Sequence, residues 1–299
     1  MIKFKPLELE DRSIFSKYLG DYCFKTYEYS FLTLYLWRKM FKTEYGILDD
    51  ALIIKKSNKS TGSYFMQPIG YKKRDIESIV LKLNDIRKSN PDFKSLFRDI
   101  EAPFLEEFGR CFGGNISVSE DLNNFDYVYN CRQLAALSGS KFHRKKNQYN
   151  QFVNRYDYRI KDIHDETVSG DCAAFIEKWY ENKEDSGDQL KHEYEAVSNL
   201  LGKITQLDIK GMAVYIDNCL AGFTIGEKAG RDMAIIHVEK GDVAYSGIYP
   251  FIIKTFADKY LNDVNFINRQ EDMGIEGLRK AKMAYNPVRL EKKYVVDLL

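Results

Sequence analysis

Two spacings of hydrophobic residues alternate along the second half of the chain. Apolar positions repeat at helical spacing through 170–182 and 189–203, and strand-like runs follow at 211–217, 219–227 and 232–240. The rest of the pattern predicts a helix at 247–261, a strand at 264–268, a helix at 275–285 and a closing strand near 287–296. This half therefore contains two helices and three antiparallel strands, followed by a helix, a strand, a helix and a strand.

The first half repeats this order more faintly. It predicts helices near 9–19 and 30–40, strands at 44–48, 51–56 and 63–70, a helix at 73–89, a strand at 95–100, a short helix at 102–109 and a strand at 115–120. Three antiparallel strands, a crossover helix and a further strand form a mixed sheet covered by helices. Because the order resembles the layout of GNAT acyltransferases (acyl-CoA N-acyltransferases), we predict an α+β protein with two tandem GNAT-like domains.

The repeat also sets the expected domain boundaries. We expect an N-terminal GNAT-like domain over 1–125, a bridging segment with a helix over 126–157, and a C-terminal GNAT-like domain over 158–299. Polar residues gather more densely in the second half, and this places the main ligand cleft in the C-terminal domain.

The charge balance limits the kinds of partner. The 299 residues include 45 Lys and Arg against 44 Asp and Glu, so any site for a polyanion has to be a local patch. The five cysteines are scattered without a metal-binding spacing, and no metal site is expected. The sequence shows no signal peptide and no run of 18 uncharged apolar residues, which predicts a cytoplasmic protein without an integral membrane segment.

A local patch of basic residues lies at 138–152, with the sequence SGSKFHRKKNQYNQF. On a helix, Lys145 and Lys146 flank the packed apolar stripe, whereas Arg144 points away from it. A helix start and nearby lysines attract phosphate, so we predict that this patch binds a phosphate-bearing ligand. The alternative interpretation is that the lysines only solvate an exposed helix start.

Several longer stretches resemble a known bacterial family. FDYVYNCRQLAALSGSKFHRKKNQYNQF, IHVEKG, INRQEDMGIEGLRKAKMAYNP and YEYSFLTLYLWR are similar to signature stretches of an uncharacterised family related to the C-terminal catalytic domain of phosphatidylglycerol lysyltransferases and, more distantly, to Fem-type peptidyltransferases. The resemblance implies a tandem GNAT fold and an acyltransferase or aminoacyltransferase. Such an enzyme moves an acyl group from aminoacyl-tRNA or acyl-CoA to an amine or hydroxyl.

One observation qualifies this resemblance. The usual GNAT pyrophosphate loop, Q/R-x-x-G-x-G/A, is incomplete, because HVEKG is followed by DVAYSGIYP. Acyl-CoA and aminoacyl-tRNA therefore both stay open as the donor, and binding of coenzyme A is not decided by the sequence. An alternative function is a non-catalytic GNAT-derived module that binds RNA or another phosphate-bearing ligand.

Two stretches in the second half carry the candidate chemistry. Attack by an amine on an ester or thioester needs a base, donors for the developing oxyanion and a proton for the leaving group. The first stretch, 237–250, follows a strand with acidic, basic and glycine residues, and the second, 268–282, gathers charged residues after a buried strand. Functional groups gather at the carboxyl ends of strands in open sheets.

We assign candidate roles to these residues as follows. The candidate catalytic residues are Glu239, His237, Glu271, Asp272 and Tyr249, with Glu239 preferred as the base. The candidate donor or phosphate-binding residues are Lys145, Lys146, Arg144, Lys240 and Gly247. The candidate substrate-binding residues are Asn268, Arg269, Arg279 and Lys282. Tyr245 and Tyr285 are further possible proton donors.

Overall fold

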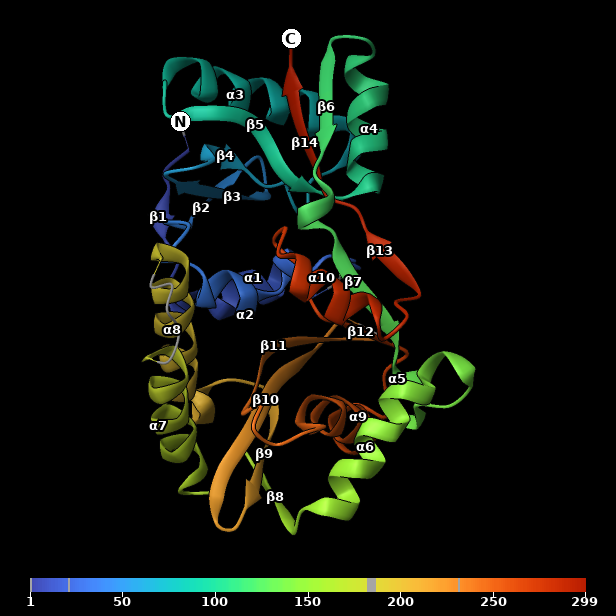
Figure 1. Ribbon diagram of the computed structural model, residues 1–299. Helices are drawn as coiled ribbons and strands as arrows, with labels where there is room; N and C mark the ends of the chain where they lie inside the picture. The colour runs from blue at the N-terminus through green and yellow to red at the C-terminus, as the bar shows by residue number, and fades with distance from the viewer. Residues whose placement is uncertain (1, 21, 182–186, 231) are drawn as a thin grey trace. The chain divides into compact units, whose positions relative to one another are not determined.

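The computed structural model describes residues 2–20, 22–181, 187–230 and 232–299 (Figure 1). Contacts between residues divide the chain into two compact units. The first unit combines Met1–Asp126 with Glu291–Leu299, and the second unit is Tyr127–Leu290.

The first unit is built on a seven-stranded sheet. Its strands lie in the order β1-β2-β3-β4-β5-β14-β6. They are β1 (Lys5–Pro6), β2 (Glu44–Leu48), β3 (Ala51–Asn58), β4 (Gly62–Phe65), β5 (Phe93–Ile100), β14 (Tyr294–Leu298) and β6 (Ile116–Glu120). The α-helices of this unit are α1 (Arg12–Leu19), α2 (Phe31–Leu36), α3 (Ile76–Ser89) and α4 (Ala102–Phe112). Apolar faces of α3 and α4 form a core with β5 and β14, where Leu83, Phe97 and Phe108 are fully buried.

The second unit also contains a seven-stranded sheet, in the order β13-β7-β12-β11-β10-β9-β8. Its strands are β7 (Asp126–Asn130), β8 (Tyr158–Asp162), β9 (Lys210–Ile216), β10 (Cys219–Ala229), β11 (Met233–Gly241), β12 (Phe266–Asn268) and β13 (Arg289–Glu291). Its α-helices are α5 (Cys131–Ala136), α6 (His143–Arg155), α7 (Val168–Glu181), α8 (Asp188–Leu201), α9 (Ile248–Tyr260) and α10 (Glu276–Met283). Helices α5, α6 and α9 lie on one side of this sheet, and α7 and α8 lie on the other (Figure 1).

The two sheets repeat one arrangement. In the first, β2, β3 and β4 are antiparallel, α3 follows, and β5 lies parallel to β4. In the second, β9, β10 and β11 are antiparallel, α9 follows, and β12 lies parallel to β11. The predicted α+β class with two tandem GNAT-like sheets is confirmed.

Each sheet also contains one strand supplied by the other half of the chain. β7 directly follows β6 in the sequence, but it pairs with β12 in the second sheet. β14 follows β13, but it pairs with β5 and β6 in the first sheet. The division therefore differs from the expected boundaries: residues 291–299 go with the first unit, and 127–157 go with the second. The single closing strand expected near 287–296 is two strands in different sheets.

Helix α6 covers the start of α9 within the second unit. Phe152 is fully buried, and its ring centroid lies 4.4 Å from that of Phe251 on α9. Gly247, just before α9, has φ of +89°, and a Cβ on it would lie 2.3 Å from the carbonyl oxygen of Gln148. The α6 backbone therefore approaches so closely that only glycine fits at this position.

We expect Gly247→Ala to lower the free energy of unfolding by about 2 kcal/mol or more, because the new methyl group meets backbone that cannot turn aside. Urea unfolding followed by circular dichroism measures the change. Gly139→Ala is the matched control, since Gly139 has φ of +88° and no atom within 4 Å of its added Cβ. If the two variants lose equal stability, the left-handed backbone alone sets the cost and the close contact with α6 contributes nothing.

Candidate functional site

A buried ion pair lies where two parallel strands of the second unit end. Arg269 directly follows β12, Glu239 lies near the end of β11, and Arg269 Nη2 donates to Glu239 Oε1 at 2.8 Å. The two side chains are only 11% and 13% exposed. Burial alone lowers the pKa of Arg269, but Glu239 and the neighbouring tyrosines raise it above its ordinary value. The guanidinium therefore stays charged and requires anionic or polar partners.

Aromatic rings and a lysine surround this pair. The guanidinium carbon of Arg269 lies 4.8 Å from the ring centroid of Tyr285 and 5.5 Å from that of Tyr129. The half-buried Lys145, from the first turns of α6, places its ammonium 4.3 Å from the Tyr285 ring. Burial lowers the pKa of Lys145, and the charges of Arg269 and Arg144 lower it further. We call Tyr129, Lys145, Glu239, Arg269 and Tyr285 the Arg269 cluster.

Three buried polar atoms of this cluster are unsatisfied. Arg269 Nη1, Glu239 Oε2 and Tyr285 Oη have no hydrogen-bond partner among the described residues. A buried polar group without a partner costs about 1–3 kcal/mol, so native proteins rarely keep three of them together. One donor, one anionic acceptor and one hydroxyl thus remain available for the polar groups of a ligand.

The loop that carries Arg269 is held by residues predicted to bind substrate. The buried ammonium of Lys282 donates to the carbonyl oxygens of Arg269, Gln270 and Glu271. Asn268 is also buried, and its Oδ1 accepts from the Gln270 amide at 2.8 Å. Lys282 and Asn268 therefore position the loop, because the Lys282 ammonium and the Asn268 Oδ1 atom form hydrogen bonds with its backbone. Glu271 lies in this loop, and its backbone carbonyl is one of the three that Lys282 holds.

Asp272 is fixed by a second network in the same loop. Its carboxylate accepts from Arg279 Nε at 2.6 Å and Nη2 at 2.8 Å, from the Gly274 amide at 2.8 Å, and from the Tyr127 hydroxyl. The Arg279 hydrogen bonds are the main cause that lowers the pKa of Asp272 to about 2. A fully hydrogen-bonded carboxylate with so low a pKa is a poor general base. Asp272 and Arg279 therefore support the loop, and we do not retain Asp272 as a candidate base.

His237 and Lys240 lie apart from the Arg269 cluster. His237 is buried and its Nε2 lies 2.9 Å from Oε1 of Glu227, beside a register shift between β10 and β11. Lys240 donates to Glu193 Oε1 at 2.9 Å and lies 3.9 Å over the ring of Trp179, on the face covered by α7 and α8. Of the three candidates on β11, only Glu239 belongs to the Arg269 cluster, whereas His237 and Lys240 have other partners.

The remaining candidates lie around α6 and the start of α9. Tyr249 is tied to the end of β11, since its hydroxyl donates to the Gly241 carbonyl at 3.2 Å and accepts from the Gly241 amide at 3.3 Å. Gly247 contacts the α6 backbone. Arg144 and Lys146 are exposed at the beginning of α6, on either side of the half-buried Lys145.

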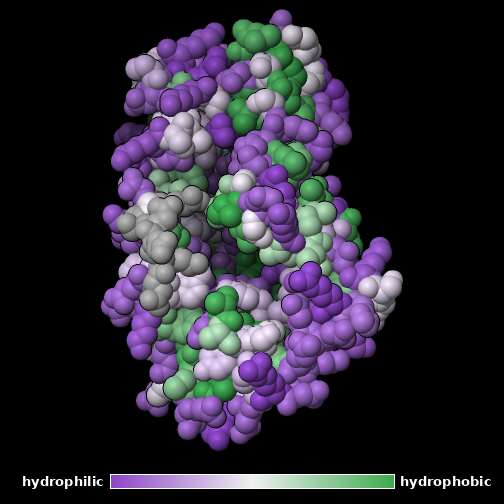
Figure 2. Space-filling view, in the orientation of Figure 1, coloured by the Kyte–Doolittle hydropathy of each residue, from purple (hydrophilic) through white to green (hydrophobic). Residues whose placement is uncertain are grey.

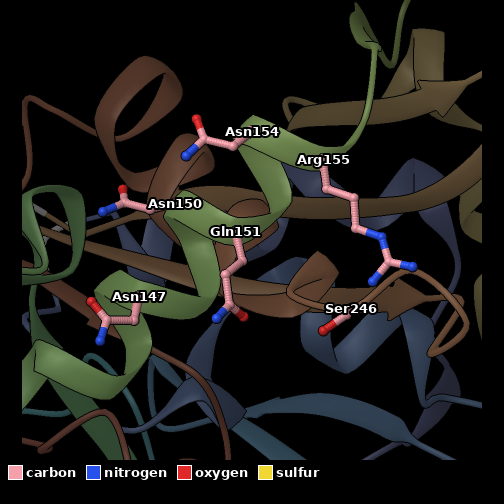
Figure 3. Close-up of a pocket in the computed structure, with 6 residues that line it drawn as sticks. All are labelled: Asn147, Asn150, Gln151, Asn154, Arg155 and Ser246. Atoms are coloured by element: carbon pink, nitrogen blue, oxygen red, sulfur yellow. The ribbon is translucent and has the colours of Figure 1, made fainter.

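A shallow groove of about 480 Å³ runs beside α6 (Figure 3). Asn147, Asn150, Gln151, Asn154 and Arg155 of the helix line it, together with Ser246 from the loop before α9. None of the residues with a predicted role is among them. The groove has amide groups instead, which sequence reasoning had not identified as a site.

Tyr129 is the member of the cluster that sequence reasoning missed. It lies on β7, a strand that was not predicted, and the only signal was its place in the aromatic run FDYVYN. Tyr285 had been considered only as a possible proton donor.

The sequence matches the family described as "Phosphatidylglycerol lysyltransferase, C-terminal" over residues 22–297. The chain belongs to this family. The chain is similar to a conserved protein of unknown function from Bacteroides thetaiotaomicron VPI-5482. The two share 28% identity over the full length of both chains, and their structures superpose with a TM-score of 0.92. It also matches an uncharacterized protein of Mycoplasmoides gallisepticum with 25% identity over 184 residues, which is 61% of this chain and 58% of that protein, so the chain spans less than two thirds of that relative.

More distant structures share the fold. The C-terminal domain of a putative lysylphosphatidylglycerol synthetase from Agrobacterium fabrum superposes with a TM-score of 0.59 at 10% identity, covering 86% of this chain and 84% of that one. A tandem GNAT protein from the clavulanic acid biosynthesis pathway superposes with a TM-score of 0.50 at 9% identity, covering 99% and 97%. Membership in this lysyltransferase family supports the predicted general class, an acyl or aminoacyl transferase. No helix among the described residues is long and apolar enough to cross a membrane.

Proposed function

We propose that this family member transfers an aminoacyl group from aminoacyl-tRNA to an amine or hydroxyl, and that the reaction takes place at the Arg269 cluster. The observation that carries the proposal is the set of three buried, unsatisfied polar atoms on Arg269, Glu239 and Tyr285. An aminoacyl ester and its acceptor offer matching groups, because the ester carbonyl oxygen accepts from the two donors and the N–H or O–H of the acceptor donates to the carboxylate.

The chemistry assigns a role to each side chain. The acceptor nitrogen or oxygen attacks the ester carbonyl carbon, and Glu239 Oε2 receives the proton that the acceptor loses. Arg269 Nη1 and the Tyr285 hydroxyl donate to the carbonyl oxygen as negative charge develops on it. The ester C–O bond then breaks, and the ribose oxygen leaves as a hydroxyl with a proton from Lys145, whose lowered pKa makes it a better acid.

The start of α9 favours tRNA over coenzyme A as the donor. Amides at such a helix start bind pyrophosphate when they are open. Here Gly247 lies against Gln148 of α6, and the Ser246 amide donates to the Tyr156 hydroxyl at 3.2 Å. Because α6 covers this position, the residues present do not fit the pyrophosphate of an acyl-CoA. The exposed Arg144 and Lys146 are available for phosphates of a larger donor.

The direct test is a transfer assay. Total bacterial tRNA charged with radiolabelled amino acids serves as donor, and phosphatidylglycerol vesicles or lysine-containing peptides serve as acceptors. Label moving to either acceptor supports the proposal. Transfer from acetyl-CoA but from no aminoacyl-tRNA would overturn the choice of donor, and binding of tRNA without any transfer would favour a non-catalytic module.

A single hydroxyl separates this function from a structural role. Burial raises the pKa of Tyr285 well above its usual range, so its hydroxyl stays protonated and able to donate. Because that hydroxyl has no partner among the described residues, Tyr285→Phe should leave the unfolding midpoint unchanged or slightly raised. We expect the transfer rate to fall about 10–100-fold. This is somewhat less than the loss typical for removing one oxyanion donor, because Arg269 still donates to the same oxygen. Tyr129→Phe is the control, since the Tyr129 hydroxyl donates to the Lys282 carbonyl at 2.8 Å and its loss should cost stability. Unchanged transfer by Tyr285→Phe would remove this hydroxyl from the site.

A further inference from the structure

The outer face of α6 carries a stripe of amides. Asn147, Asn150, Gln151 and Asn154 are all exposed, and each lies three or four residues from two of the others, so that they share one face of the helix. At 1.5 Å per residue, the stripe is about 10 Å long and lies on one side of the helix. The packed side chains Phe142 and Phe152 lie toward the core, so the amides serve no packing purpose.

This helix is also free of negative charge. Its sequence, HRKKNQYNQFVNR, has no Asp or Glu between His143 and Arg155, although the whole chain balances acidic and basic residues. Arg144 and Lys146 are exposed at one end of the stripe, and Arg155 lies at the other. The surface over this helix, at the lower right of Figure 2, is hydrophilic.

The amides line a built groove. Gln151 and Arg155 point toward Ser246 across it (Figure 3), and its described lining contains no carboxylate. Each amide both donates and accepts hydrogen bonds. A groove with uncharged amides along its length and cations at its ends fits a ligand that combines hydroxyl groups with regularly spaced phosphates.

We propose that this outer face of α6 docks the double-stranded stem of an RNA. The inference rests on the proposed function, in which the donor is an aminoacyl-tRNA. An RNA helix presents 2′-hydroxyls and base edges in a wide, shallow minor groove, and the amides match these groups. The exposed Arg144, Lys146 and Arg155 contact the flanking phosphates. The charge pattern favours RNA over an acidic protein, because an acidic surface would be matched by further cations, whereas here the centre of the stripe is uncharged.

Binding of an uncharged RNA hairpin that copies a tRNA acceptor stem tests the proposal. The triple variant Asn150→Ala/Gln151→Ala/Asn154→Ala should bind it at least about 10-fold more weakly than the wild type, by loss of contacts to 2′-hydroxyls. Its salt dependence should stay the same, because the phosphate contacts remain. By contrast, Arg144→Gln/Lys146→Gln/Arg155→Gln should make the dependence on salt shallower. Fluorescence anisotropy over a salt series measures both effects.

The controls use the same protein and a matched nucleic acid. Gln133→Ala/Asn262→Ala removes exposed amides elsewhere in the second unit and should leave RNA binding unchanged. A DNA hairpin of the same sequence lacks 2′-hydroxyls, so it should bind the wild type more weakly and be unaffected by the triple variant. Equal RNA affinity of the triple variant and the wild type would overturn the proposal, as would equal affinity for RNA and DNA. Because the hairpin carries no amino acid, this result does not depend on whether transfer occurs.

Discussion

Glu239→Gln loses about 10²–10⁴-fold in transfer rate, the range expected when a positioned proton acceptor is removed. Glutamine keeps the shape of the side chain and can still contact Arg269, but it cannot receive the proton of the attacking group. Steady-state transfer of a radiolabelled aminoacyl group measures the loss. Binding of uncharged tRNA should persist, because no phosphate contact of α6 is changed.

The paired variant separates chemistry from stability. Glu239→Gln alone leaves the buried guanidinium of Arg269 without its 2.8 Å anionic partner, which should lower the free energy of unfolding. Glu239→Gln/Arg269→Gln removes both charges and should recover stability while staying inactive. Full activity in Glu239→Gln would show that the carboxylate is structural, and the base would have to be sought elsewhere.

Asp272→Asn lowers the free energy of unfolding by about 2–3 kcal/mol. The substitution removes the charge that two Arg279 nitrogens and one backbone amide hold at 2.6–2.8 Å. Breaking a buried ion pair costs about 3–5 kcal/mol, and the lower figure applies because Arg279 is 34% exposed and can be rehydrated. Urea unfolding gives the value. Glu276→Gln, which removes the carboxylate of an exposed pair with Lys280, is the control and should change stability by less than about 0.5 kcal/mol.

The same carboxylate predicts how stability changes with pH. Its pKa is about 2 in the folded chain and 3.8 in the ordinary state. The stabilisation is therefore complete above about pH 4 and is lost as the pH falls through 2. Between pH 5 and pH 2 the difference in unfolding free energy between wild type and Asp272→Asn should shrink. A difference that stays constant over this range would show that Asp272 is not the group that titrates.

The sequence predicted the elements much better than their pairing. Helical and strand spacing located β2, β3, β9, β10 and β11 almost to the residue, because each has a continuous apolar face. β7 was missed although Val128 and Tyr129 are fully buried, since it lies in a stretch that reads equally well as a connection. The pattern along 287–296 gave one strand because periodicity reveals the direction of side chains but not which sheet a strand joins.

The candidate site was predicted in part for a similar reason. Candidate site residues were predicted at the ends of two strands, and the structure brings two of them, Glu239 and Arg269, into contact. A strand pattern does not reveal that a register shift separates His237 from Glu239. It also does not reveal that the ammonium of Lys282 donates to three backbone carbonyls. These outcomes depend on three-dimensional partners that lie 10 or more residues away.

The exchange of β7 and β14 makes neither half an independent module. A fragment ending after residue 126 would lack β14, the strand between β5 and β6, and a fragment starting at residue 158 would lack β7, the strand between β13 and β12. Because a sheet with a missing internal strand exposes backbone hydrogen-bonding groups to solvent and to other chains, such fragments are expected to aggregate. The two halves therefore cannot be shuffled, truncated or recombined separately, and any splitting of this chain for engineering has to keep both crossing strands.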